Sequence, residues 1–204
     1  MCSSDLRLTK IEDEDFRLTM ASHVEGTLNV MRATVPTMRA HGYGRIVNTS
    51  SIAVRGTVAG GAYGAAKGAI ESLTRTLAAE GARRNINVNA ISPYALSQMT
   101  APYMTSEVAA RFSPEQVVPM VLWLASEQSQ ASGEIIVAGD GYFRRGYNVE
   151  TASATGDDLS MAGVFKAISN RPGTNYPSSN AAFESLLLEM GLLRTEGALE
   201  AKQD

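Results

Sequence analysis

The chain has 204 residues, 44% of them hydrophobic, and its 18 basic and 21 acidic residues give a net charge of −3. This size and near balance suit one globular domain and exclude the basic footprint of a nucleic-acid-binding protein. Cys2 is the single cysteine and no apolar run approaches the ~20 residues of a membrane helix, so we predict no internal disulfide, no membrane partner and a cytoplasmic location.

Helical periodicity dominates the first part of the chain. Apolar residues recur at helical spacing from Phe16 to Met38, after the acidic run 12–15, which favours a helix N-terminus through the helix dipole. Gly42 ends this long helix, and the apolar run 45–48 that follows is predicted to be a buried strand.

Helices and strands then alternate. Residues 92–112 show little periodicity, whereas the other segments are predicted as a helix over 61–83, a strand over 86–91, a helix over 113–124 and a strand over 134–137. This alternation predicts an α/β fold with a parallel sheet.

The C-terminal part is predicted to contain a helix over 159–168, a loop over 170–177 and an amphipathic helix over 181–193, with a frayed tail over 195–204. The apolar stripe of the helix over 181–193 needs a partner, which is either the domain itself or another subunit.

A tyrosine and a lysine are spaced for proton transfer. Tyr63 and Lys67 lie four residues apart, so on a helix both face one cleft beside Ser51 at the end of the preceding strand. A free phenol has a pKa near ~10, and a nearby cation favours the phenolate. The three residues suit a carbonyl/alcohol interconversion with a hydride carrier alongside. The alternative is an amphipathic helix on which both side chains are simply solvated.

The wider pattern resembles the short-chain dehydrogenase/reductase family. The stretch 44–51, the Tyr63/Lys67 helix and the stretch 87–93 occur in the family's order, and the resemblance covers residues 7–147. It implies the C-terminal part of a doubly wound, Rossmann-like parallel sheet with flanking helices. It also implies an NAD(P)-dependent oxidoreductase that interconverts a secondary alcohol and a ketone, with NAD or NADP as cofactor and a homodimer or homotetramer as assembly.

Departures from the usual family pattern point to one branch. His23 stands where most members have asparagine, the spacer from Pro93 to Thr100 is longer than usual, and the stretch 114–124 has a distinctive sequence. All three are similar to the (3R)-hydroxyacyl-CoA dehydrogenase part of peroxisomal multifunctional enzymes of type 2. The resemblance therefore implies a 3-hydroxyacyl-CoA as substrate. A general ketone or steroid-type reductase and a non-catalytic, oligomerising protein are the alternatives.

The resemblance also implies a role for each matching residue. Tyr63 would be the general acid/base, Lys67 would favour its phenolate and hold the nicotinamide ribose, and Ser51 would orient the substrate oxygen. His23 would replace the asparagine of the proton relay, or else be a satisfied core residue. The Ser51–Tyr63 loop is one residue shorter than usual, which leaves Ser50 as the alternative catalytic serine.

Two further residues would contact the cofactor. The resemblance implies that Pro93 and Thr100 line the nicotinamide, while Tyr63 and Lys67 contact the same half of the cofactor. The pattern contains no metal site.

The first mononucleotide half of the doubly wound sheet is expected to be missing. The chain shows no glycine-rich phosphate loop before its first helix, so we expect it to be inactive as given. We predict that residues 1–6 are non-native, because they back-translate to the end of a sequencing adapter, with an ordinary polar tail as the alternative. Residues 7–147 would be a partial dehydrogenase domain and residues 148–204 a C-terminal extension. The open sheet would make the chain poorly soluble alone.

Overall fold

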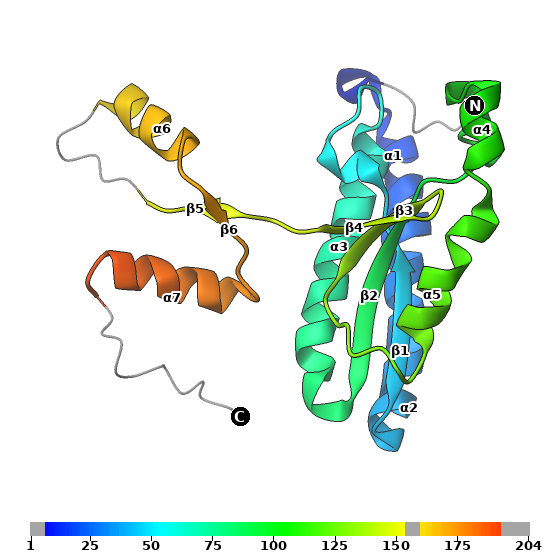
Figure 1. Cartoon of the computed structure of the whole chain (residues 1–204), viewed down its shortest axis with the longest axis horizontal. Coiled ribbons are helices and arrows are strands. Elements are labelled where there is room, and N and C mark those ends of the chain that lie inside the picture. Colours follow the sequence, from blue (N-terminus) through cyan, green and yellow to red (C-terminus); the bar gives the residue numbers. More distant parts are fainter. Residues whose placement is uncertain (1–6, 154–159, 193–204) are drawn as a thin grey trace. The chain divides into compact units, whose positions relative to one another are not determined.

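The computed structural model describes residues 7–153 and 160–192, and these form two compact units that divide between Gly146 and Tyr147 (Figure 1). The first unit contains α1 (Asp13–Met20), α2 (Gly26–His41), β1 (Gly44–Thr49), α3 (Gly61–Gly81), β2 (Ile86–Pro93), α4 (Ser106–Arg111), α5 (Val118–Ala125), β3 (Ile135–Gly139) and β4 (Tyr142–Gly146). The second contains β5 (Glu150–Thr151), α6 (Met161–Ser169), β6 (Gly173–Thr174) and α7 (Ser179–Glu189).

The first unit is built on a four-stranded sheet in the order β1-β2-β3-β4. β1, β2 and β3 are parallel, with Thr49 opposite Ile91 and Pro93 opposite Ala138, which confirms the predicted parallel sheet over these strands. β4 is antiparallel to β3 and was not predicted. Its signal is the Asp140-Gly141 pair, both at positive φ, because such a pair forms a two-residue hairpin turn.

One continuous helical segment precedes the sheet, as predicted, but it is not uniform. Between α1 and α2 the residues Ala21–Glu25 form a π-helical turn, and this turn carries His23. Such turns are rare and often occur at functional sites. Gly42 ends α2 in the left-handed conformation, at φ 64°, which a glycine adopts without strain.

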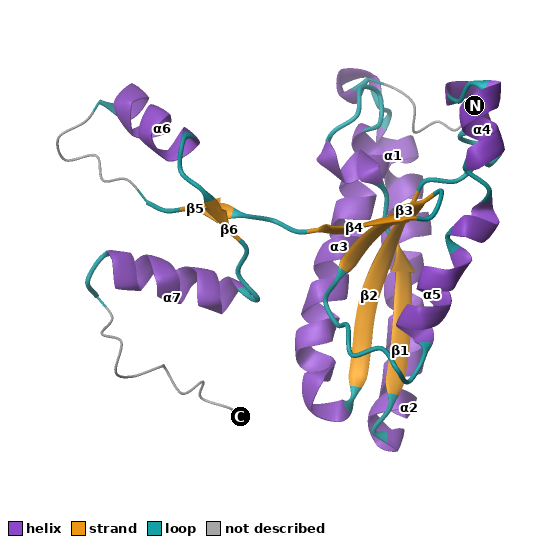
Figure 2. Cartoon of the chain, in the orientation of Figure 1, coloured by secondary structure: helices purple, strands orange, loops and turns teal. Residues whose placement is uncertain are grey.

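The two faces of the sheet are covered by different helices (Figure 2). Alternate residues of β2 point to opposite faces, so Val88 packs against α2 and α3 while Ile91 packs against α5. One core cluster comprises Met31, Val35, Leu77, Ala78, Ile86 and Val88, and the other comprises Ile91, Val117, Leu124, Ile136 and Ala138.

Buried amides hold the strands to their surroundings. Asn89, which is fully buried, donates from Nδ2 to Ala131 O at 2.8 Å and accepts at Oδ1 from Glu134 N at 3.0 Å. Asn48 donates from Nδ2 to Thr74 Oγ1 on α3 at 2.8 Å. Because a buried polar group without a partner is costly, these bonds fix the register of β1 and β2 against the elements around them.

The segment between β2 and α5 contains more structure than its sequence predicted. α4 forms there because the Thr105 hydroxyl caps it by accepting from Val108 N at 3.3 Å. Its six residues are too few for an apolar repeat to be visible. The predicted helix over 113–124 is present as a 3₁₀ turn, Pro114–Gln116, followed by α5.

The second unit contains both helices predicted for it. α6 and α7 are each capped by a serine, Ser160 and Ser178, whose hydroxyl accepts from a backbone N–H in the first turn. The short pair β5 and β6 was not predicted, because two-residue strands show no alternation. The predicted tail over 195–204 and the predicted non-native residues 1–6 lie outside the described residues.

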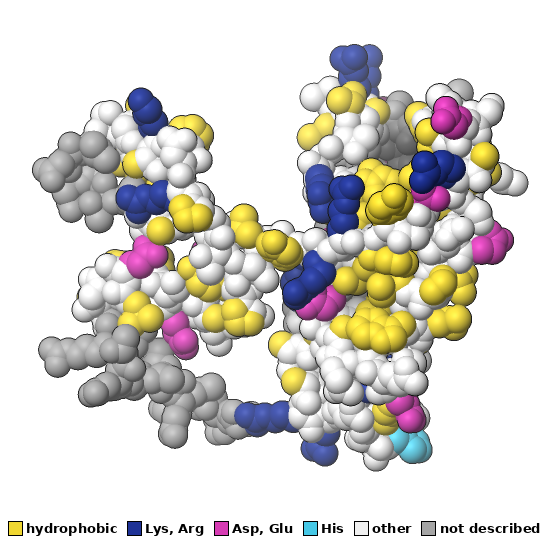
Figure 3. Space-filling model, in the orientation of Figure 1, with side chains coloured by type: hydrophobic (Ala, Val, Ile, Leu, Met, Phe, Trp, Pro, Cys, Tyr) yellow, Lys and Arg dark blue, Asp and Glu magenta, His cyan; other side chains and the backbone are white. Residues whose placement is uncertain are grey.

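Part of the surface of the first unit is apolar. An apolar area lies over α5 and β4 (Figure 3), where Leu122, Trp123, Tyr142 and Phe143 are 65%, 45%, 69% and 44% exposed. Within the described residues, no helix is both long and apolar enough to cross a membrane.

Candidate active site

The predicted catalytic residues gather where the carboxyl end of β1 meets the first turns of α3. Tyr63 and Lys67 lie on one face of α3, as their spacing predicted. Ser51 lies two residues beyond the last residue of β1, Thr49, and is the N-cap of the 3₁₀ turn Ile52–Arg55, which contacts α3. In open α/β sheets, ligands bind outside the carboxyl ends of the strands, so this is the expected place for a site.

Lys67 is held against the end of β1. Its ammonium donates to Thr49 O at 2.8 Å and lies 5.5 Å from the centre of the Tyr63 ring. The residue is only 6% exposed, and this burial lowers the pKa of Lys67 below its ordinary value. An ammonium has three N–H donors, so one bond to Thr49 leaves donor capacity for a ligand.

His23 reaches the same place from the π-helical turn before α2. Its ring meets the Tyr63 ring edge to face, with centroids 5.3 Å apart and planes at 75°. Burial lowers the pKa of His23 below 6.5, and the nearby Lys67 charge lowers it further. The ring is therefore biased toward its neutral form, which has one donor and one acceptor nitrogen.

The structure separates the two candidate serines. Ser50 is 1% exposed, and its hydroxyl donates to Glu71 Oε1 on α3 at 2.7 Å. Ser51 is half-buried, and its hydroxyl accepts from Ala53 N at 3.2 Å, which is a local cap of the following turn. The Ser51 hydroxyl can therefore still donate a hydrogen bond to a ligand, whereas the Ser50 hydroxyl already donates its hydrogen bond to Glu71.

A glycine allows the serine-bearing loop to approach α3. A Cβ on Gly64 would lie 2.7 Å from Ala53 O, a distance that side-chain carbons essentially never show against backbone. Gly64 is the neighbour of Tyr63, and Ala53 is two residues from Ser51. The absence of a side chain at this position thus brings the Ser51 loop to the tyrosine turn of α3.

Pro93 and Thr100 lie at the end of β2 and in the loop beyond it. Pro93 is the exposed last residue of the strand. The Thr100 hydroxyl donates to Ala95 O at 2.7 Å and accepts from Ser97 N at 2.8 Å, so it closes the loop on itself. Their predicted contact with a nicotinamide stays a prediction.

The residues present fit one end of a nicotinamide dinucleotide. A buried ammonium beside a phenol at the carboxyl ends of parallel strands offers donors for a ribose and for a substrate oxygen. The pyrophosphate normally lies on a glycine-rich turn after the first strand of the sheet. Within residues 7–153 and 160–192, no strand precedes α1, so these residues do not contain that turn.

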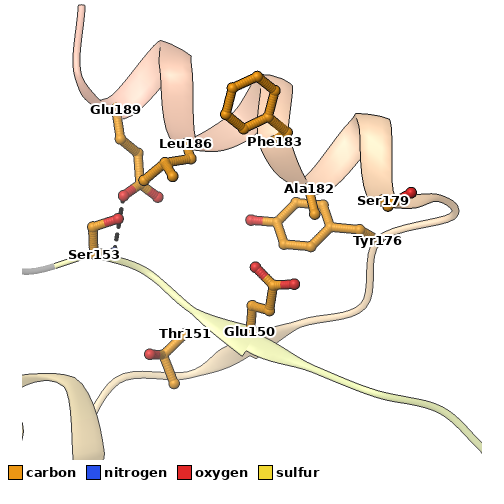
Figure 4. Close-up of a pocket in the computed structure, with 9 residues that line it drawn as sticks. All are labelled: Glu150, Thr151, Ser153, Tyr176, Ser179, Ala182, Phe183, Leu186 and Glu189. Atoms are coloured by element: carbon orange, nitrogen blue, oxygen red, sulfur yellow. Dashed lines mark hydrogen bonds between the residues drawn. The ribbon is translucent and has the colours of Figure 1, made fainter.

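A separate cavity of about 300 Å³ lies in the second unit. Figure 4 shows the side chains of Glu150 and Tyr176 beside it, with Phe183 and Leu186 of α7 along its wall. Glu189 accepts there from Ser153 N at 2.9 Å, and this hydrogen bond lowers the pKa of the Glu189 carboxyl. None of the predicted catalytic residues lines this cavity.

Comparison with known proteins places the chain in a family. The family described as enoyl-(acyl carrier protein) reductase matches residues 2–143. The chain belongs to the short-chain dehydrogenase/reductase family. The peroxisomal hydratase-dehydrogenase-epimerase of Saccharomyces cerevisiae is 37% identical over 140 residues, and the peroxisomal multifunctional enzyme type 2 of Mus musculus is 37% identical over 139 residues.

Solved structures extend the similarity. The full-length peroxisomal multifunctional enzyme type 2 of Drosophila melanogaster matches 91% of this chain and 36% of its own, with a TM-score of 0.78 and 26% identity. The NAD⁺-bound xylitol dehydrogenase matches 68% of this chain and 65% of its own, with a TM-score of 0.59 and 28% identity. The yeast and mouse matches each cover 68% of this chain but only 16% and 19% of the relatives' lengths.

Sequence reasoning missed two residues of this candidate site. Glu71 follows Lys67 by another four residues, so helical spacing alone placed it on the same face, but nothing in the sequence paired it with Ser50. Gly64 stands inside the Tyr63/Lys67 motif, where a glycine in mid-helix signals a close approach.

Proposed function

We propose that the chain carries the catalytic half of an NAD(P)-dependent oxidoreductase that interconverts a secondary alcohol and a ketone. The observation that carries this proposal is the contact set around Tyr63. The buried Lys67 ammonium lies 5.5 Å from the centre of the phenol ring, and the centre of the His23 ring lies 5.3 Å from it. A phenol with a cation and an imidazole close by has both a charge that favours the phenolate and a group that can carry the proton.

The protein's own groups handle the proton in this proposal. During reduction Tyr63 donates its phenolic proton to the substrate oxygen, and during oxidation it takes that proton back. Ser51 donates a hydrogen bond to the same oxygen and holds it in line with the phenol. His23, neutral at pH 7 because of its lowered pKa, passes the proton between the phenol and solvent.

Lys67 has two tasks. Its ammonium favours the phenolate that remains on Tyr63 after proton donation, and its remaining N–H donors bind the nicotinamide ribose. The bound nicotinamide supplies or accepts the hydride at the substrate carbon. Pro93 and Thr100 would border the nicotinamide at the end of β2. The family and the NAD⁺-bound structural neighbour support NAD or NADP as the cofactor.

We further propose a 3-hydroxyacyl-CoA as the substrate. The support is the similarity to the peroxisomal multifunctional enzymes, which include a protein named as a hydratase-dehydrogenase-epimerase. His23 and the long Pro93–Thr100 spacer, which pointed to the same branch, lie at the π-helical turn and at the end of β2. The alternative substrate is a free ketone or steroid. The cytoplasmic location stays a prediction, and the named relatives are peroxisomal.

The proposed enzyme also needs a nucleotide-binding half. We propose that residues 7–147 are completed by a segment encoded upstream of Arg7, with strands that pair with the edge of β1 and a glycine-rich turn for the pyrophosphate. We call the product of that longer reading frame the extended protein. Residues 148–204 would remain its C-terminal extension, and its assembly would be a homodimer or homotetramer.

The experiment is to sequence the source DNA upstream of the Arg7 codon and assay the extended protein. We expect NAD(P)-linked oxidation of a 3-hydroxyacyl-CoA, followed by absorbance of the reduced nicotinamide. Turnover of free ketones alone would replace the acyl-CoA proposal with the reductase alternative. A frame that begins at Met1, or an extended protein without nicotinamide binding, would contradict the proposed activity and favour the non-catalytic alternative.

A further inference from the structure

A carboxylate on α3 holds the residue that precedes the proposed catalytic serine. Glu71 Oε1 accepts from the Ser50 hydroxyl at 2.7 Å, and its other oxygen lies 3.5 Å from Arg75 Nη2. The Glu71 side chain is 13% exposed and Ser50 is 1% exposed, so little water competes for this bond. Hydrogen bonds to an ionised acceptor are about twice as strong as neutral ones.

Ser50 is fixed from two sides at the point where the chain leaves the sheet. Its backbone N–H donates to Ile91 O on β2 at 2.7 Å, and its hydroxyl reaches Glu71 on the helix above. The next residue, Ser51, begins the 3₁₀ turn over α3. The orientation of the Ser50 side chain therefore sets the direction in which the Ser51 peptide leaves the strand.

The same helix face holds the residues on either side of Ser51. Lys67 binds Thr49 O at 2.8 Å before it, and the side-chain-free Gly64 admits Ala53 O after it. With Glu71 on Ser50, three consecutive turns of α3 each hold one part of the Thr49–Ala53 segment.

We propose that Glu71 is a positioning residue of the active site: through Ser50 it sets the place of the Ser51 hydroxyl relative to Tyr63. This inference rests on the proposed function for its catalytic consequence, while its structural part stands on the contacts of Glu71. A purely structural carboxylate would contribute stability only, and its loss would leave the Ser51 turn in place.

The first test uses amide NMR and hydrogen exchange on the chain. Glu71→Leu removes the acceptor, whereas Glu71→Gln keeps an amide oxygen that accepts from Ser50. Glu80→Leu is the matched control, because Glu80 is on the same helix but pairs at the surface with Arg39 at 3.4 Å. We expect Glu71→Leu to shift the Ser51 and Ala53 amide signals and to reduce exchange protection of the Ala53 N–H about tenfold.

Each outcome of this test either supports or overturns the proposal. Glu71→Gln and Glu80→Leu are expected to leave the Ser51 and Ala53 signals in place, and protection in the middle of β2, at Asn89, is expected to stay constant in all variants. A Glu71→Leu protein in which the Ser51 and Ala53 amides are unchanged would overturn the proposal. A uniform loss of protection that includes Asn89 would also overturn it, since that result marks a general loss of stability.

The second test uses the extended protein and follows turnover. A displacement of a catalytic group by about 1 Å costs up to ~10²-fold in rate, so we expect Glu71→Leu to lower kcat about tenfold to a hundredfold with the nicotinamide KM unchanged. In a Ser51→Ala background the same change is expected to cost nothing further, because Glu71 acts through Ser51. Equal losses in both backgrounds would contradict the proposal.

The two tests separate this inference from the proposed function. If the extended protein shows no nicotinamide-linked turnover, the proposed function fails while the NMR result still decides whether Glu71 positions the Ser51 turn. If turnover is present and Glu71→Leu changes neither the Ser51 amide nor kcat, the proposed function stands and the role of Glu71 falls.

Discussion

Replacing Gly64 with alanine adds one methyl group where α3 meets the serine-bearing loop. The new Cβ would lie 2.7 Å from Ala53 O, and the nearest atom is backbone, so the loop or the helix must move. Gly68, one turn further along α3, is the matched control, because a Cβ there meets nothing within 4 Å. Both substitutions replace a helix-interior glycine with alanine, and this replacement by itself stabilises the folded protein by about 0.5–1 kcal/mol.

The two substitutions should therefore change the free energy of unfolding in opposite directions. Gly68→Ala is expected to raise the free energy of unfolding by about 0.5–1 kcal/mol. Gly64→Ala gains the same stabilisation of the helix but loses about 1–3 kcal/mol to overpacking, so the free energies of unfolding of the two variants should differ by about 1–3 kcal/mol. For a chain of this length, that is about 2–4 °C in Tm for each kcal/mol.

Urea unfolding and thermal melting of the two variants, followed by far-ultraviolet circular dichroism, measure this difference. Equal stabilisation by both alanines would refute the reasoning, because it would mean that the Ser51 loop does not rest against α3 at Gly64. In the extended protein we also expect Gly64→Ala, and not Gly68→Ala, to lower kcat, since the methyl group displaces the Ser51 turn from Tyr63.

Other predictions concern charge and buried hydrogen bonds. His23 should titrate below 6.5 in ring-carbon NMR, and Lys67→Met should raise its pKa because one cause of the shift is removed; an unmoved titration would exclude the Lys67 charge as a cause. A lowered folded pKa means that His23 binds more protons in the unfolded state, so its contribution to the free energy of unfolding should be present above pH 6.5 and be lost as pH falls toward the folded pKa. The comparison is with His23→Asn, which has no titrating ring; if the wild type loses no more stability than this variant over that pH range, the prediction is contradicted. Asn89→Ala leaves Ala131 O and Glu134 N–H without their partner and should destabilise by about 2–4 kcal/mol in urea unfolding; a loss below 1 kcal/mol would mean that water replaces both bonds.

The sequence predicted those parts of the fold that produce a periodic pattern of residues along the chain. The four-residue spacing of Tyr63 and Lys67 placed them on one helix face, and the alternation of apolar strands and amphipathic helices predicted that β1, β2 and β3 belong to a parallel sheet. Both inferences rest on local periodicity, which a single sequence displays.

Contacts between residues far apart in the sequence, and short elements, could not be predicted from the sequence. The Ser50 to Glu71 bond joins residues twenty-one positions apart, and only the structure decides that Ser50, rather than Ser51, turns toward the helix. The π-helical turn that carries His23 has ordinary helical composition, so periodicity could not reveal it. β4 and α4 are short and exposed, and neither buries enough apolar surface to produce a pattern.

The measurement that tests the central claim most directly is the effect of Tyr63→Phe on nicotinamide-linked turnover of the extended protein. Removing the phenolic hydroxyl leaves the ring contact with His23 in place, so only the proton donor is lost. General acid/base catalysis contributes about 10²–10⁴-fold, and we predict a fall in kcat within that range with nicotinamide binding retained. A Tyr63→Phe enzyme with wild-type kcat would contradict the assignment of this site.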